Sequence, residues 1–127
     1  MRLESRQTDN FDIKGGVVQG SRLGPILFDV FLNDLIGNIK SKCKCISVRG
    51  INLNLIAYAD DLVLIASSPQ ELNKMLKIAH SWSIKNFMQF NAKKSECLVV
   101  HNSRISKKTR QNLKFFLGNN ELKIIEQ

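Results

Sequence analysis

The chain has 127 residues, 43% of them hydrophobic, with 19 Lys or Arg, 11 Asp or Glu and only two prolines. This length and composition predict one folded domain with a single core, and they exclude disordered and collagen-like chains. The longest apolar runs hold five residues, whereas a membrane-spanning helix needs about 20. Because the polar N-terminus has no apolar signal segment, we expect an intracellular protein, in the cytoplasm or nucleus, with no membrane partner.

The formal net charge of +8 is concentrated in the last third of the chain. Residues 84–127 hold nine basic and three acidic side chains. A field of this sign favours a polyanionic partner such as nucleic acid. A basic surface that only keeps the chain in solution is the alternative.

The first strong helical pattern follows a loop of small residues at 15–21. Seven apolar residues then recur at helical spacing and predict a buried helix: Leu27, Phe28, Phe31, Leu32, Leu35, Ile36 and Ile39. Pro25 suits the first turn of this helix, where its missing N–H costs nothing. Gly37 and Asn38 predict the end of the helix.

A series of apolar runs after a basic linker predicts strands. Residues 46–48 and 51–59 are expected to pair around a turn at Arg49, and residues 62–66 form a further strand. The Asp60–Asp61 pair predicts a two-residue turn between the last two runs. Because these runs are apolar at both alternating sets of positions, we expect helices to cover both faces of this hairpin.

A second helix begins at a recognisable cap. Ser68, Pro69 and Glu71 match the capping box, in which the Ser and Glu side chains satisfy N–H groups of the first turn. Five residues share one face of this helix and predict core positions: Leu72, Met75, Leu76, Ala79 and Trp82.

The last part of the chain adds further strands. Residues 96–101 predict a strand, and Gly118 with two following asparagines predicts a hairpin between residues 115–117 and 122–125. Helices mixed with antiparallel strand pairs place the chain in the α+β class.

The three cysteines, Cys43, Cys45 and Cys97, are expected to be reduced thiols inside a cell. Together with His101 they suggest a zinc site, but their spacing matches no zinc pattern. We therefore expect ordinary buried or surface thiols, with zinc binding as the minor alternative.

The Asp60–Asp61 pair has two interpretations. As a plain turn it needs no partner, since Asp is favoured in tight turns. Two carboxylates about 4 Å apart, however, repel by roughly 4 kcal/mol at an effective dielectric near 20, and a bound cation relieves that repulsion. Mg²⁺ prefers oxygen ligands and is commonly held by one or two carboxylates together with substrate phosphates. Two such ions are the basis of nucleotidyl transfer in polymerases.

Four blocks in order give the chain a family resemblance. The segment Tyr58-Ala59-Asp60-Asp61 between apolar strands resembles the catalytic turn of reverse transcriptases. The other blocks resemble the family's Gln-Gly loop with its palm helix, its Asn-x-x-Lys element and its primer-side hairpin, and they are residues 16–35, 90–95 and 117–119. Over residues 15–125 the chain is most similar to the reverse transcriptases of non-LTR (LINE) retrotransposons, with group II intron enzymes as relatives. It departs from the family's usual residues at Gly24, where Ser is usual, and at Asp29, where Asn is usual.

The resemblance implies a partial polymerase palm, with an antiparallel sheet and a catalytic hairpin packed against two helices, and a small C-terminal hairpin. The implied activity is RNA-directed DNA polymerisation, a nucleotidyl transfer from deoxynucleoside triphosphates with an RNA template and a DNA primer. By the same resemblance Asp60 is a ligand of both catalytic Mg²⁺ ions and Asp61 is a supporting ligand.

Further roles are also implied by the resemblance. Gln19 and Gly20 line the template and incoming-nucleotide side, where a glycine lets the backbone approach a ligand closely. Lys94 points toward the triphosphate and protonates the leaving pyrophosphate. Tyr58 packs near the primer end or is a plain strand aromatic, and the sequence leaves both interpretations open.

The family's first catalytic aspartate, which follows an aromatic residue on an upstream strand, has no convincing copy before Gly15. Asp9 and Asp12 flank Phe11 in a polar stretch. We therefore expect residues 1–127 to be a single partial domain that lacks the fingers, the first catalytic strand and the thumb, and that binds Mg²⁺ weakly or not at all by itself.

A catalytically dead remnant that binds nucleic acid is the alternative function. It would contact phosphates through the basic C-terminal segment: Arg104, Lys107, Lys108, Arg110 and Lys114. A missing palm strand would also leave an unpaired sheet edge, which favours self-association.

Overall fold

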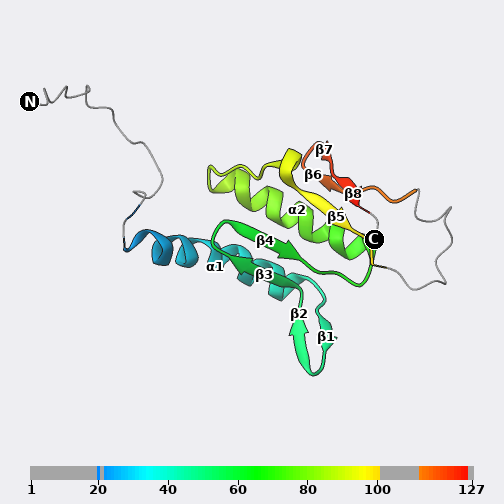
Figure 1. The fold of residues 1–127 in the computed structure, drawn as a ribbon, viewed down its shortest axis with the longest axis horizontal. Coiled ribbons are helices and arrows are strands. Elements are labelled where there is room, and N and C mark those ends of the chain that lie inside the picture. The colour runs from blue at the N-terminus through cyan, green and yellow to red at the C-terminus, as the bar shows by residue number, and fades with distance from the viewer. Residues whose placement is uncertain (1–19, 21, 101–111, 126–127) are drawn as a thin grey trace, which may run out of the picture.

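The computed structural model describes residues 20, 22–100 and 112–125, which form two α-helices, one 3₁₀ turn and eight short strands (Figure 1). Along the chain these elements are α1 (Gly24–Lys42), β1 (Ile46–Val48), β2 (Ile51–Leu53), β3 (Leu55–Tyr58), β4 (Asp61–Leu64), α2 (Pro69–Lys85), η1 (Ala92–Lys94), β5 (Glu96–Leu98), β6 (Phe116–Leu117), β7 (Asn120–Glu121) and β8 (Lys123–Ile125). The mixture of helices and antiparallel hairpins confirms the α+β class. None of the helices in the described part is long and apolar enough to cross a bilayer.

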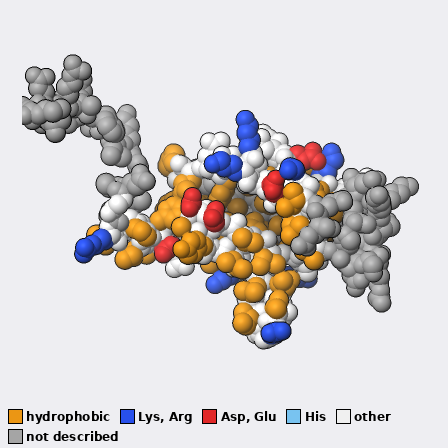
Figure 2. All heavy atoms as spheres, viewed as in Figure 1, with side chains coloured by type: hydrophobic (Ala, Val, Ile, Leu, Met, Phe, Trp, Pro, Cys, Tyr) orange, Lys and Arg blue, Asp and Glu red, His pale blue; other side chains and the backbone are white. Residues whose placement is uncertain are grey.

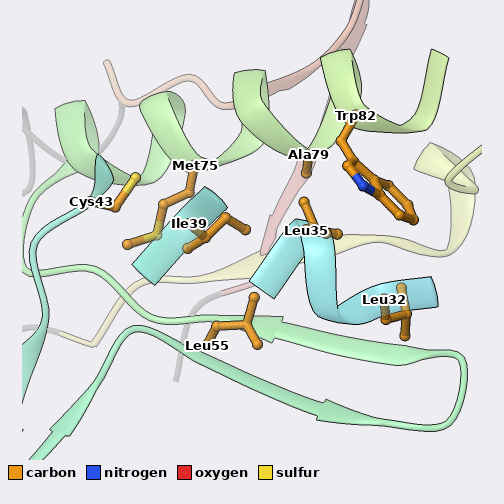
Figure 3. Packing of buried hydrophobic residues seen from close by; sticks show 8 residues of the cluster. All are labelled: Leu32, Leu35, Ile39, Cys43, Leu55, Met75, Ala79 and Trp82. Atoms are coloured by element: carbon orange, nitrogen blue, oxygen red, sulfur yellow. The ribbon is translucent and has the colours of Figure 1, made fainter. Parts of the chain in front are cut away.

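The core has α2 at its centre. One side of α2 packs against α1 and strand β3, and Figure 3 shows the residues of this cluster: Leu32, Leu35, Ile39, Cys43, Leu55, Met75, Ala79 and Trp82. The other side of α2 packs against the C-terminal strands through a second cluster: Leu76, Cys97, Phe115, Leu117 and Leu122. The apolar stripe predicted for this helix is therefore confirmed as core.

Helix α1 is longer than the sequence predicted. The chain does not leave the helix at Gly37–Asn38 but continues to Lys42, so the predicted end is wrong. Asn38 supports the extra turn, since its Nδ2 donates to the Asp34 carbonyl at 2.8 Å and its Oδ1 accepts from Lys42 Nζ at 2.9 Å. Ile39 is fully buried on this turn, and its burial offsets the weak helix propensity of glycine.

Helix α2 begins where the cap predicted. The Ser68 hydroxyl accepts from the Glu71 backbone N–H at 3.2 Å, and Pro69 lies in the first turn. The reciprocal half of the capping box is absent among the described contacts, because the Glu71 carboxylate accepts from the Lys44 backbone N–H at 2.7 Å instead. Glu71 thus joins the start of α2 to the segment that follows α1.

The predicted strand at residues 51–59 is split in two. Asn54 interrupts it, with only 2% of its surface exposed. The Asn54 side-chain amide donates to the Cys43 carbonyl at 3.4 Å, and its own carbonyl accepts from the Ile65 N–H at 2.9 Å. The bend at Asn54 separates hairpin β1–β2 from hairpin β3–β4, which are distinct two-stranded sheets.

A hairpin forms around Gly118 as predicted, but its second arm is Asn120–Glu121 and not the predicted residues 122–125. β6 pairs with β7 around Gly118–Asn119, and the buried Leu122 then interrupts the strand. β8 leaves the hairpin and pairs in parallel with β5, which the sequence did not predict. The described strands therefore form four two-stranded sheets, one of them parallel, rather than the single antiparallel sheet that was expected.

Gly118 is under tight steric constraint. Its φ is +64°, and a Cβ added there would lie 2.5 Å from Cε1 of the His80 ring on α2. Gly118→Ala should therefore lower the free energy of unfolding by about 1–2 kcal/mol, chiefly from backbone strain, because the His80 side chain can turn away from the new methyl group. Urea unfolding followed by circular dichroism measures this change.

Gly37→Ala is the matched control. Gly37 lies inside α1 and has open space around its Cα. Alanine there should raise the free energy of unfolding by about 0.5–1 kcal/mol, because alanine is the better helix former. Equal effects of the two substitutions would contradict the steric account of Gly118.

Candidate functional site

Hairpin β3–β4 carries the acidic pair. Its register pairs Tyr58 with Asp61, so the turn consists of Ala59 and Asp60. The predicted Asp60–Asp61 turn is therefore wrong by one residue, because Ala59 adopts a φ of +49° and reverses the chain early. Asp60 lies in the turn, and Asp61 is the first residue of β4.

The hairpin has one buried face and one open face. The inward face packs against the core cluster through Leu55, Ala57, Leu62 and Leu64. The outward face carries Ile56, Tyr58 and Val63, which are exposed by 48%, 82% and 53%. The expectation that helices cover both faces is wrong, since the core that α1 and α2 form lies against one face (Figure 3).

The two carboxylates at this turn are accessible. Asp60 and Asp61 are both exposed, and the side-chain carboxylate of neither forms a hydrogen bond or ion pair with another residue in the described ranges. Figure 2 shows carboxylate groups beside hydrophobic side chains over this end of the hairpin. Adjacent unpaired carboxylates in water are ligands for a hard divalent cation.

The described part of the chain holds no complete metal site. No three His, Cys, Asp or Glu side chains gather there in an arrangement that could hold an ion. Two carboxylate ligands fit Mg²⁺ in chemistry, since that ion takes its remaining ligands from water and phosphate. Asp9 and Asp12 lie outside the described residues.

Ala59 stores strain beside this acidic pair. A non-glycine residue in the left-handed region costs roughly 1–2 kcal/mol, and such strain tends to gather at functional sites. Ala59→Gly should raise the free energy of unfolding by about 0.5–1 kcal/mol, the strain relief being partly offset by the greater freedom of glycine in the unfolded chain.

Ala57→Gly in β3 is the control for this prediction. Ala57 packs toward the core and is not among the residues of positive φ. Glycine there should lower the free energy of unfolding by about 0.5–1 kcal/mol. Chemical denaturation of both variants measures their free energies of unfolding. If Ala59→Gly lowered this free energy, the claim that Ala59 is strained would be contradicted.

The other predicted nucleotide-site residues lie on different elements. Gly20 is an exposed turn residue with a φ of +85°, and an added Cβ there would meet nothing within 4 Å. Lys94 is exposed on η1, and its ammonium forms no ion pair with the described part of the chain. Gln19 falls outside the described residues. The structure brings Tyr58, Asp60 and Asp61 together in one hairpin.

Of the five basic residues predicted to contact phosphates, only Lys114 is described. It is exposed, and its Nζ lies 3.6 Å from the Glu121 carboxylate. The others lie outside the described residues: Arg104, Lys107, Lys108 and Arg110.

The cysteines do not gather. Cys43 and Cys97 belong to different core clusters, and Cys45 is exposed. Burial raises the pKa of the Cys97 thiol, and burial is also the main reason that the pKa of the Cys43 thiol is raised. A raised pKa disfavours the thiolate form that zinc requires, and His101 lies outside the described residues.

A groove between β4 and β5 is a feature that the sequence did not reveal. This apolar hollow of about 420 Å³ is lined by residues 62–65, in β4 and just after it, and by residues 95–98, in β5 and just before it. Leu72, Leu76 and Ala79 of α2 also contribute. Successive side chains of a strand point to opposite faces, so a hollow lined by four consecutive residues lies against the strand edge. β4 pairs with β3 and β5 with β8 on their other sides, so within the described residues both edges at the groove are unpaired.

Comparisons with known proteins agree on one family. A family model for reverse transcriptase (RNA-dependent DNA polymerase) matches residues 2–120. The chain is 26% identical over 91 residues to a retrovirus-related Pol polyprotein from type-1 retrotransposable element R1 of Nasonia vitripennis, covering 67% of this chain and 24% of that protein. It is 32% identical over 95 residues to the corresponding R2 polyprotein of Popillia japonica, covering 74% of this chain and 13% of that protein. No solved structure matches significantly, and the chain spans a quarter or less of these relatives.

Proposed function

Since the chain belongs to the reverse transcriptase family, we propose that it forms part of the palm of an RNA-directed DNA polymerase of the non-LTR retrotransposon type. The main support is hairpin β3–β4, where two accessible carboxylates lie at the tip of an otherwise apolar ribbon with one open face. The proposed substrates are deoxynucleoside triphosphates, an RNA template and a DNA primer. The proposal places this activity inside the cell.

Asp60 and Asp61 are the proposed ligands of two Mg²⁺ ions. Mg²⁺, when bound, supplies Lewis-acid activation of the primer 3′-hydroxyl and charge neutralisation at the leaving oxygen. The two aspartates are suited to this role because they are exposed and free of protein partners among the described residues. Asp60 is the principal ligand, since the turn carries it beyond the end of the paired strands.

The open face of the hairpin is the proposed binding surface for the primer end. Tyr58 offers an exposed ring that can pack on a sugar or stack on a base. Gly20 allows close approach of its backbone to the template or nucleotide. Lys94, exposed and without an ion pair in the described part, binds the triphosphate and donates a proton to pyrophosphate.

The third carboxylate of the site is proposed to arrive on a further strand in the β4–β5 groove. In Figure 1 the arrows of β4 and β5 point the same way, so one strand running antiparallel to both would pair with the two free edges. Unpaired strand edges are templates for such addition. The polyproteins that resemble this chain are much longer, and the proposed strand belongs to a longer polypeptide of that kind.

A catalytically dead remnant that binds nucleic acid is the second candidate. It is favoured by one observation, the lack of a third acidic ligand within the described ranges. Both candidate functions predict nucleic-acid binding, but only the polymerase predicts Mg²⁺-dependent primer extension.

Primer extension on an RNA template with Mg²⁺ tests the proposal. The chain is assayed alone and fused behind the region that precedes the matched segment in the Popillia japonica relative, which supplies a strand for the groove. We expect little product from the chain alone and clear extension from the fusion. A folded fusion that binds primer–template without extending it would favour the dead remnant. Dimers of the chain alone that the fusion abolishes would show the predicted self-association through the free edges.

A further inference from the structure

A line of lysines follows the side of α2 away from hairpin β3–β4. Two hollows adjoin there, one of about 410 Å³ between α1 and α2 and one of about 530 Å³ between α2 and hairpin β6–β7. Lys77 and Ser81 line both hollows, so the two form one continuous surface. We name its four lysines the basic strip: Lys42, Lys77, Lys85 and Lys114.

Among the described residues, two carboxylates lie beside the four lysines of the strip, so the strip keeps a net positive charge. Asp34 lines the first hollow, and its Oδ2 accepts from Trp82 Nε1 at 3.0 Å. Glu121 lies 3.6 Å from Lys114, an exposed pair of the kind that contributes less than about 1 kcal/mol and yields to a phosphate. Lys77 and Lys85 form no ion pair within the described ranges.

The spacing of the strip suits a repeating anion. Lys77, Ser81 and Lys85 recur every fourth residue on α2, so they lie in a line along one side of the helix. At about 1.5 Å of rise per residue, Lys77 and Lys85 are separated by about 12 Å along the axis. A line of that length is long enough to contact more than one phosphate of a nucleic-acid strand.

The strip is distinct from the candidate catalytic hairpin. No residue of hairpin β3–β4 is among the described residues that line either hollow. Lys114, which the charge pattern singled out as a phosphate contact, lies on the strip. The hollows also offer neutral donors at Ser81 and Asn119, and lysines with neutral donors are typical contacts of a phosphate backbone.

We propose that the basic strip binds the phosphodiester backbone of nucleic acid at a second contact, on the side of α2 away from the polymerase hairpin. This contact goes beyond the proposed function, since it requires neither metal nor nucleotide. It would hold template or product strand outside the catalytic face without reading sequence.

Binding of the full chain to a fluorescent 20-nucleotide single-stranded RNA tests the strip, measured by anisotropy over a series of salt concentrations without Mg²⁺. The triple variant Lys77→Gln, Lys85→Gln and Lys114→Gln should lose affinity at least tenfold at about 50 mM salt. Its slope of log K against log salt should become shallower by about 2, from three lost contacts at roughly 0.7 each.

The matched control replaces three exposed basic residues that line neither hollow, Lys40, Lys44 and Arg49, with glutamine. It lowers the net charge equally and should change the slope by less than about 0.5. Equal slopes in the two triple variants would overturn the proposal. Tighter binding of the wild-type chain to poly-aspartate than to RNA would also overturn it, in favour of an acidic protein partner. The binding assay contains neither Mg²⁺ nor nucleotide, so a failure of the strip is distinct from a failure of primer extension.

Discussion

Replacing Trp82 with alanine should lower the free energy of unfolding by about 3–5 kcal/mol, the range for loss of a large buried aromatic side chain. Because domains of this kind are stable by only about 5–15 kcal/mol, the variant should lose a large part of its stability.

Three interactions at Trp82 account for this size. The side chain is 5% exposed and joins α2 to α1 in the main core cluster. Its ring centroid lies 5.0 Å from that of Phe31 at a tilt of 57°, a favourable aromatic geometry. Its Nε1 donates to the Asp34 carboxylate at 3.0 Å, a charge-assisted bond that alanine would leave unmade.

Trp82→Phe separates packing from hydrogen bonding. Phenylalanine keeps most of the ring but not the donor, so the loss should be about 1–3 kcal/mol. Urea unfolding is followed by circular dichroism, since Trp82 is the chain's only tryptophan and its fluorescence is lost in both variants. A loss below about 1 kcal/mol for Trp82→Ala would mean that the two helices are not held together through this residue.

Features encoded by neighbouring residues were predictable from the sequence. The start of α2 followed from Ser68 and Pro69, and its core face followed from apolar spacing, because both signals act within a few turns of the helix. The hairpin around Gly118 was predictable for the same reason, since its φ of +64° suits glycine.

Features that depend on distant contacts were not predictable. The parallel pairing of β8 with β5 and the burial of Asn54 against the Cys43 carbonyl are set by tertiary packing. The open face of hairpin β3–β4 was missed because Ile56 and Val63 are apolar without being covered, and sequence does not say on which side a helix packs.

The candidate site likewise has features that neighbouring residues encode and features that depend on distant contacts. The acidic pair was recognisable from four consecutive residues, Tyr58 to Asp61, and the structure places them in one tight hairpin. The groove between β4 and β5 could not be predicted, because its walls come from segments about 30 residues apart in the sequence. The unpaired strand edges are also a property of the backbone, which the side-chain pattern does not reveal. The basic strip likewise combines lysines of α1, α2 and the segment before β6.

Asp60→Asn in the strand-restored fusion should lower the rate of primer extension by about 10³-fold or more. An amide keeps the size of the side chain but removes the negative charge that holds a divalent cation. Loss of about 4 kcal/mol of transition-state stabilisation corresponds to roughly a thousandfold in rate. Asp61→Asn should lower the rate less, by about tenfold, if Asp61 is the supporting ligand.

Asp29→Asn is the matched control for the loss of a carboxylate. Asp29 is exposed on α1, and asparagine is the residue usual there in the family that the chain resembles. Single-turnover extension of all three variants is compared at several Mg²⁺ concentrations, and Asp29→Asn should match the parent. Asp60→Asn should also leave unfolding nearly unchanged, since its carboxylate has no partner among the described residues. Unchanged extension by a folded Asp60→Asn variant would remove this aspartate from catalysis, and with it the metal site proposed at this hairpin.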